Sequence, residues 1–284
     1  MPSSTSTATE VHSSFAFSDL VASLESEAEG RPVLDLARGL SRRSGIPLEL
    51  VTVNSPGTAE RRDRDELQAA LDRAGAEGRP VVLHGDDVAV AVAEHLDQLV
   101  NPLVCMVSRG RRPFGAMVLG SASEELLRRT RHPVLLVGPK ARAMTTLSRT
   151  LVACLDGTDA SEHILPVVLA WTSTFGGDVL AVRHVADDVS ADDVSADEAR
   201  IGAAQLERAV VWLRERDVAA GSEVIEGRSA SIAICEVARR VGVSAVAMTT
   251  HARPPLRRIE FGSVALDVLR DAERPVLLVN PAAA

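Results

Sequence analysis

Residues 132–139 read HPVLLVGP and residues 274–281 read RPVLLVNP, so this chain of 284 residues contains nearly the same stretch twice, 142 positions apart. Each copy is an apolar, β-rich run that a proline opens and a Gly-Pro or Asn-Pro pair closes. This pattern is typical of a short buried strand that ends in a turn. A repeated domain would explain the two copies, provided that the flanking sequence repeats as well.

The flanking sequence does repeat over most of the chain. GSASEELLRRTR (120–131) precedes the first copy and GSVALDVLRDAE (262–273) the second, and both predict a helix that begins at Gly-Ser. Near the start of each half, LVASLESEAEG (20–30) aligns with LVACLDGTDAS (151–161), but at an offset of 131. The second half therefore contains an insertion. We assign it to the acidic stretch 186–198, which duplicates ADDVS and is typical of a solvated loop.

The repeat divides the chain into two domains of ordinary size, residues 18–140 and residues 148–284. Residues 1–17 are predicted to be a disordered tail. The polar stretch MPSSTSTATEVHSS has neither basic residues nor an apolar core, so it is not expected to be a secretion signal. In the second half, short apolar strands alternate with helical stretches, which is typical of a parallel sheet with helices on both faces. Each half is thus predicted to be a doubly wound α/β domain with a five-stranded parallel sheet and four helices.

Composition excludes several classes of protein. With 46% hydrophobic and 25% charged residues the chain is predicted to be soluble and globular, and no apolar run approaches the roughly 20 residues that cross a bilayer. The formal charge is −8, but six acidic residues lie in the insertion and the rest stands near −2, so no nucleic-acid-binding surface is indicated. Cys105, Cys154 and Cys235 are far apart without a C-x-x-C motif, which favours free buried thiols in a cytoplasmic protein.

In doubly wound sheets, ligands bind beyond the carboxyl ends of the strands, where the strand order reverses. This rule points to three places in each half: the residues after the first strand, the end of the second strand, and the segment between the fourth strand and the last helix. Gly120-Ser121 begins the last predicted helix of the first half and Gly262-Ser263 that of the second. Unsatisfied N–H groups at a helix start attract anions. Ordinary N-capping by the two serines is an alternative that stays open.

The sequence resembles the universal stress protein family, in its tandem two-domain form, over about residues 18–282. The family's phosphate signature is Gly, two residues, Gly, nine residues, Gly and then Ser or Thr, usually after a Met that ends the fourth strand. The first half departs from it at Val107, which replaces the leading glycine. The rest of the signature is present in the first half as Met106, Gly110, Gly120 and Ser121.

The second half departs from the signature at Thr249 and Ala252, which replace the two leading glycines. Its matching positions, with a histidine where the family often has one, are Met248, His251, Gly262 and Ser263. The family's aspartate after the first strand is Asp156 here, whereas Glu25 stands in that place in the first half. Arginines in the same loops either bind phosphate in place of the missing backbone contacts or form a solvated face: Arg109, Arg111, Arg112 and Arg253.

The resemblance implies an adenine nucleotide alpha hydrolase-like fold and a cytoplasmic, regulatory stress protein that binds ATP, with Mg²⁺, in at least one half. The alternative is a nucleotide-free member of the family that acts as an interaction or assembly module. No Ser-His-Asp order, paired carboxylate motif or H-x-x-x-H spacing appears on a common loop, and the seven histidines are scattered. An enzyme is therefore not expected, although slow ATP hydrolysis stays open.

The family also pairs its last strands across a dimer. Here the two repeated stretches are predicted to pair within one chain, as an intramolecular pseudo-dimer that covers both sheet edges. Pairing of two chains into a homodimer stays open, and neither nucleic acid nor a membrane is expected as a partner.

Overall fold

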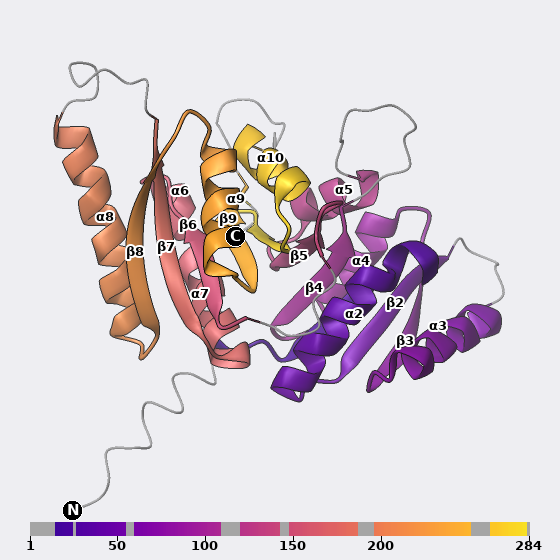
Figure 1. Cartoon of the computed structure of the whole chain (residues 1–284). Coiled ribbons are helices and arrows are strands. Elements are labelled where there is room, and N and C mark those ends of the chain that lie inside the picture. The colour runs from indigo at the N-terminus through magenta and orange to yellow at the C-terminus, as the bar shows by residue number, and fades with distance from the viewer. Residues whose placement is uncertain are drawn as a thin grey trace, which may run out of the picture.

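The computed structural model describes residues 15–24, 27–54, 60–108, 120–142, 148–186, 196–250 and 262–282. Both halves show strands alternating with helices (Figure 1). The described part of the first half has the four predicted helices, whereas that of the second has five, because the helix expected after the first strand is divided at His163. The first half consists of β1 (Asp19–Ser23), α2 (Glu27–Ser44), β2 (Leu48–Asn54), α3 (Glu60–Ala74), β3 (Gly78–His84), α4 (Val88–Leu96), β4 (Pro102–Val107), α5 (Ser121–Arg129) and β5 (Val134–Val137). The second half consists of β6 (Thr150–Cys154), α6 (Asp159–Glu162), α7 (Ile164–Phe175), β7 (Asp178–Val185), α8 (Ala196–Arg214), β8 (Ala219–Glu226), α9 (Ala230–Val241), β9 (Ala245–Thr249), α10 (Ser263–Asp271) and β10 (Val276–Val279).

The strands form one continuous sheet in the order β3-β2-β1-β4-β5-β10-β9-β6-β7-β8. All neighbours within a half pair in parallel. Between the halves, β5 and β10 pair antiparallel, with Leu135 opposite Leu277. These are the strands of the two repeated stretches. The pairing covers the inner edges of both half-sheets, whereas β3 and β8 remain the outer strands. The strand order reverses between β1 and β4 and again between β6 and β9.

Helices cover both faces of the sheet, which confirms the predicted α/β fold class. Successive strand residues point to opposite faces, so Leu135 and Leu277 join a core beneath α2, α3, α7 and α8. Leu136 and Leu278 join a second core beneath α4, α5, α9 and α10. Each core contains side chains from both halves and is therefore continuous across the β5–β10 junction. None of the helices in the described ranges is long and apolar enough to cross a membrane.

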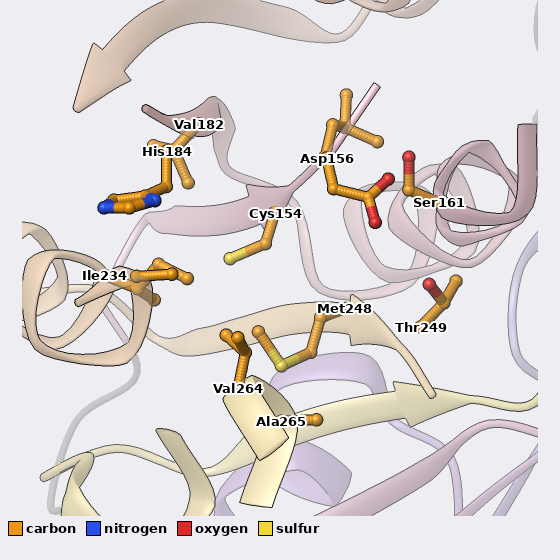
Figure 2. A pocket seen from close by; sticks show the side chains of 12 residues that line it. Cys154, Asp156, Ser161, Val182, His184, Ile234, Met248, Thr249, Val264 and Ala265 are labelled. Carbon is orange, nitrogen blue, oxygen red and sulfur yellow. The ribbon is translucent and has the colours of Figure 1, made fainter. Parts of the chain in front are cut away.

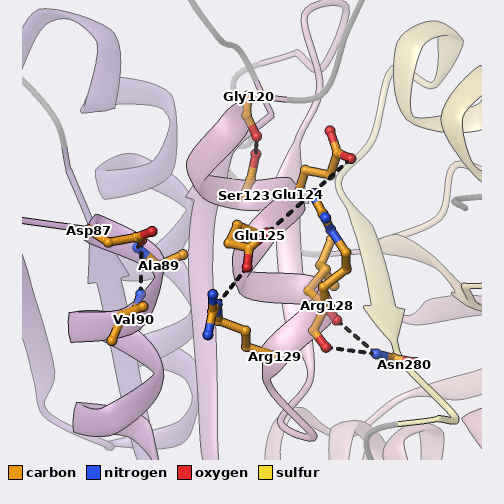
Figure 3. A network of polar contacts seen from close by, with 11 residues as sticks. Asp87, Ala89, Val90, Gly120, Ser123, Glu124, Glu125, Arg128, Arg129 and Asn280 are labelled. Carbon is orange, nitrogen blue, oxygen red and sulfur yellow. Dashed lines mark hydrogen bonds and ion pairs between the residues drawn. The ribbon is translucent and has the colours of Figure 1, made fainter. Parts of the chain in front are cut away.

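The seventh position of the repeated stretch, Gly138 in one copy and Asn280 in the other, differs because of a contact across the junction. The amide of Asn280, after β10, donates to the carbonyl oxygens of Leu127 at 3.1 Å and Arg128 at 3.4 Å, in the last turn of α5 (Figure 3). Carbonyls at a helix end lack partners inside the helix. The equivalent residue of the first half is Gly138, where a Cβ would lie 2.2 Å from the carbonyl oxygen of Leu269 in α10. The second half thus requires an amide side chain at this position, whereas the first half has room only for glycine.

The N-terminal segment also joins the halves. Phe17 is buried, its N–H donates to Oγ1 of Thr174 at 2.7 Å, and its ring centroid lies 6.1 Å from that of Phe175 in α7. The side chain of Asn101 donates to the carbonyl oxygens of residues 15 and 16. The prediction of a disordered tail is therefore wrong for residues 15–17, because Phe17 finds its apolar partner in the distant half. Residues 1–14 lie outside the described residues.

The acidic insertion is described only at its ends. Residues 187–195 lie outside the described ranges, and residues 196–198 already belong to the first turn of α8. The predicted loop, residues 186–198, therefore extends too far at its C-terminal end, because α8 already begins at Ala196.

Replacing Asn280 by glycine, the residue at the equivalent position 138, should lower the free energy of unfolding by about 1–2 kcal/mol, because two carbonyl groups of α5 lose their donor. Urea denaturation followed by the fluorescence of the buried Trp171 measures the loss. Lys140→Ala is the control, since it removes an exposed ion pair with Asp271 across the same junction and should cost less than about 1 kcal/mol. Equal losses in the two variants would contradict the assigned role of Asn280.

His132, at the start of the first repeated stretch, should make stability depend on pH. Its side chain is buried, and burial lowers the pKa of His132 despite Asp97, whose Oδ1 lies 3.2 Å from Nε2. The unfolded chain then takes up the proton at a higher pH than the folded chain does. The stabilisation is complete above the ordinary histidine pKa of about 6.5 and is lost as the pH falls toward the lowered pKa.

The urea midpoint of the wild type should therefore fall between about pH 7 and pH 5, and His132→Gln should flatten this decline. The midpoints of both proteins, measured at several pH values in this range, test the expectation. A decline of the same size in the variant would show that other groups cause it.

Candidate functional site

A pocket of about 190 Å³ opens at the carboxyl ends of the strands in the second half, where β6 and β9 lie side by side (Figure 2). This is the point at which the strand order reverses in that half. The pocket is lined by Cys154, Leu155, Asp156, Ser161, Val182, His184, Ala230, Ile234, Met248, Thr249, Val264 and Ala265. The fold therefore brings together the ends of three strands with the first turns of α9 and α10.

A tight turn presents Asp156 at the edge of the pocket. Asp156 is exposed, and its Oδ1 accepts hydrogen bonds from the N–H of Thr158 at 2.9 Å and from the hydroxyl of Thr158 at 2.6 Å. Gly157 between them has φ +90°, a conformation that favours glycine. The hydroxyl of Thr158 accepts in turn from the N–H of Ser161 at 3.2 Å and caps α6. Hydrogen bonds thus fix the whole turn that carries the carboxylate.

His184 lies at the other end of the pocket, and Figure 2 shows Cys154 between it and Asp156, with Ile234 beneath His184 and Met248 beneath Cys154. Nε2 of His184 is 2.7 Å from the carbonyl oxygen of Gly227. A carbonyl oxygen only accepts, so Nε2 carries the hydrogen of this bond. The pocket therefore has polar groups at both ends and an apolar and sulfur-containing floor between them.

The N-terminus of α10 borders the pocket. Its N-cap residue is Gly262 and Ser263 is the first helical residue, and among the described residues no side chain caps the first turn. The same holds for Gly120 and Ser121 at the start of α5, whereas Asp87 accepts from two N–H groups of α4 (Figure 3). N-capping by the two serines is therefore excluded. The unsatisfied N–H groups and the positive end of the helix dipole face the border of the pocket.

The structure places the candidate residues in two separate groups. In the second half, Asp156 and Met248 line the pocket, and Gly262 and Ser263 begin the helix beside it. In the first half, Met106 is buried at the end of β4, away from this pocket, and Gly120 and Ser121 begin α5. The remaining candidates lie outside the described residues: Glu25, Arg109, Gly110, Arg111, Arg112, His251 and Arg253.

Sequence reasoning did not assign four polar residues of the pocket to a site: Cys154, Ser161, His184 and Thr249. It named Cys154 only as a buried thiol and Thr249 only as the replacement of a signature glycine. The rule for doubly wound sheets had marked the end of the second strand, where His184 lies, but isolated histidines carry no distinctive spacing. The residues at the equivalent positions of the first half are Ser23, Gly30, Val53 and Val107. A Cβ on Gly30 would lie 2.3 Å from the side chain of Leu24, so Leu24 occupies the space that Ser161 takes in the second half.

In the part of the chain that the structure describes, no group of three or more His, Cys, Asp or Glu side chains could hold a metal ion.

The family model that matches this chain is that of the universal stress protein family, over residues 53–138 and 148–280. The chain belongs to the universal stress protein family. The two matches show the tandem form that the repeat predicted. No curated protein matches the chain.

Solved structures share the fold of most of the chain. The structure of a universal stress protein from Archaeoglobus fulgidus DSM 4304 is 17% identical and covers 93% of this chain and 99% of its own, with a TM-score of 0.66. A functionally unknown protein from Pseudomonas aeruginosa PAO1 is also 17% identical and covers 95% of both chains, with a TM-score of 0.63. At this identity the likeness concerns the fold and not the ligand.

The three cysteines should react slowly while this universal stress protein is folded. Burial raises the pKa of Cys105 to about 12 and the pKa of Cys235 to about 11, and it raises the pKa of Cys154 as well. Because the thiolate is the reactive form, an aromatic disulfide reagent at pH 8 should label the native protein at least about a hundredfold more slowly than the denatured chain. Equal rates in the two states would contradict these shifts.

Proposed function

We propose that the second half of this universal stress protein binds an adenine nucleotide, ATP with Mg²⁺, in the pocket between β6 and β9. The observation that carries the proposal is the meeting of three features at one place: the exposed carboxylate of Asp156, an apolar floor, and the uncapped N-terminus of α10. An apolar slot with a few convergent polar groups is typical of a small-molecule site.

Each part of a nucleotide has a suitable counterpart in the second half. Val182, Ile234 and Met248 form an apolar wall for a base, and the Asp156 carboxylate accepts hydrogen bonds from amino or hydroxyl groups. The N–H groups at the start of α10 and the hydroxyl of Ser263 suit phosphate oxygens. A volume of about 190 Å³ is below the roughly 300–1,000 Å³ of most ligand sites, so we assign the base and sugar to the pocket and the phosphates to the helix border.

The first half suits this ligand less well. Val53 and Val107 stand where the second half has His184 and Thr249, and Leu24 fills the space of Ser161. We therefore propose the first half as the assembly partner of the second, in an intramolecular pseudo-dimer joined by β5 and β10.

The chain would act by regulation rather than catalysis. The cysteines, which are free in the described residues, suit the reducing cytoplasm that we propose as its compartment.

Calorimetric titration of the nucleotide-free protein with ATP and Mg²⁺ tests the proposal. We expect one saturable site per chain, which Asp156→Ala weakens by at least about tenfold because a buried or half-buried polar group of the ligand loses its acceptor. Gly262→Val should abolish binding by placing a side chain at the phosphate border. The matched variant Gly120→Val, at the equivalent position of the first half, should leave binding unchanged.

Absence of heat in the wild type at high micromolar ATP would overturn the proposal and favour a nucleotide-free assembly module. Loss of binding in Gly120→Val alone would move the site to the first half. Steady release of phosphate above a blank would replace a regulatory role with slow hydrolysis.

A further inference from the structure

Arg183 on β7 is half-buried, and one nitrogen of its guanidinium group is buried where the proposed nucleotide site does not use it. Its neighbours Val182 and His184 line the pocket, so the Arg183 side chain lies on the opposite face of the sheet, toward α8. Nη1 of Arg183 is buried and has no hydrogen-bond partner among the described residues. Native proteins retain few such groups, and each one calls for a physical explanation.

Two glycines make the space that the guanidinium group occupies. A Cβ on Gly202, inside α8, would lie 1.1 Å from Nη1 of Arg183, and a Cβ on Gly157 would lie 2.8 Å from the same atom. Glycine is unfavourable inside a helix, so its presence at position 202 needs a local reason. The approach of the guanidinium group supplies that reason. Arg183 is therefore held between α8 and the turn that follows β6.

That turn is the one that presents Asp156. Gly157 is the central residue of the hydrogen-bonded loop between the Asp156 carboxylate and Thr158. A small cavity of about 10 Å³ around the guanidinium group shares Leu155 and Ser161 with the nucleotide pocket. The guanidinium group and the pocket thus lie on opposite sides of the same turn.

The first half uses the same strand position for a similar purpose. The registers of β1 with β2 and of β6 with β7 make Thr52 the equivalent of Arg183. The hydroxyl of Thr52 donates to the carbonyl oxygen of Leu24 at 3.2 Å, just before Glu25, which stands in the place of Asp156. In both halves, therefore, a side chain at this position supports the chain where it leaves the first strand.

We propose that Arg183 is a positioning residue, which packs against the Gly157 turn from the α8 side and thereby sets the direction of the Asp156 carboxylate. Arg183 does not contact the ligand. Its effect on nucleotide binding rests on the function proposed above, but its effect on the turn does not. The two consequences are measured separately.

The first experiment needs no nucleotide and follows amide hydrogen exchange by NMR in the wild type and in Arg183→Thr. Threonine is the natural residue at the equivalent position, so the strand should tolerate it. The amide of Thr158, which donates to Asp156, should exchange about tenfold faster in the variant. The amide of Leu155, which donates to the Val182 carbonyl at 2.9 Å, is the control and should not change. An unchanged Thr158 amide overturns the proposal.

Gly202→Ala tests the same geometry from the other side. The added methyl group overlaps the guanidinium group, so this variant should reproduce the faster exchange at Thr158. In the Arg183→Thr background the same methyl group meets no guanidinium group and should have no further effect. Independent, additive effects of the two substitutions would show that Arg183 does not occupy this space.

The second experiment is a double-mutant cycle on ATP binding with Mg²⁺. Arg183→Thr should weaken binding about tenfold in the wild type and have no effect in the Asp156→Ala background, because it acts through that carboxylate. Thr52→Val is the matched control and should leave binding unchanged. An equal loss in both backgrounds would overturn the positioning role. If the wild type binds no ATP, the proposed function fails, and the exchange experiment still decides the role of Arg183.

Discussion

The antiparallel pairing of β5 with β10 is the constraint on which the rest of the structure depends. Both strands are short and wholly buried, and each has a parallel neighbour on its other side, β4 or β9. An unpaired strand edge exposes a row of N–H and C=O groups, which other chains can pair with. By pairing with each other, the two edges satisfy these groups, and two half-sheets become one sheet with two continuous cores.

This junction also breaks the symmetry between the halves. The backbones at positions 138 and 280 are equivalent, yet one faces the carbonyl of Leu269 at a distance that admits only glycine, and the other provides the amide that pairs with the end of α5. Both α5 and α10 begin at a Gly-Ser pair in their own half and end against the other half. The junction therefore fixes the orientation of the two helices that border the candidate sites.

The two halves of this universal stress protein keep the same backbone but have different side chains at the carboxyl ends of their strands. Asp156, His184, Ser161 and Thr249 give the second half a polar pocket with an apolar floor. Valines and a glycine stand at the matching described positions of the first half. A shared fold thus supports a pocket in one half, while nothing in the fold itself requires the other half to bind the same ligand.

The sequence by itself determined the α/β class, the division into two halves and the alternation of strands and helices, because hydrophobic periodicity and turn residues are local properties of the chain. The family resemblance marked Asp156 and Met248, and the Gly-Ser pair at the start of the last helix marked Gly262. Only the tertiary structure decided what depends on contacts between distant residues. It packed Phe17 against Phe175, paired Asn280 with α5, gave His184 its place in the pocket, and set Arg183 between Gly157 and Gly202. Each of these contacts joins residues that are far apart in the sequence and meet only after folding. No local pattern in the sequence encodes such a contact.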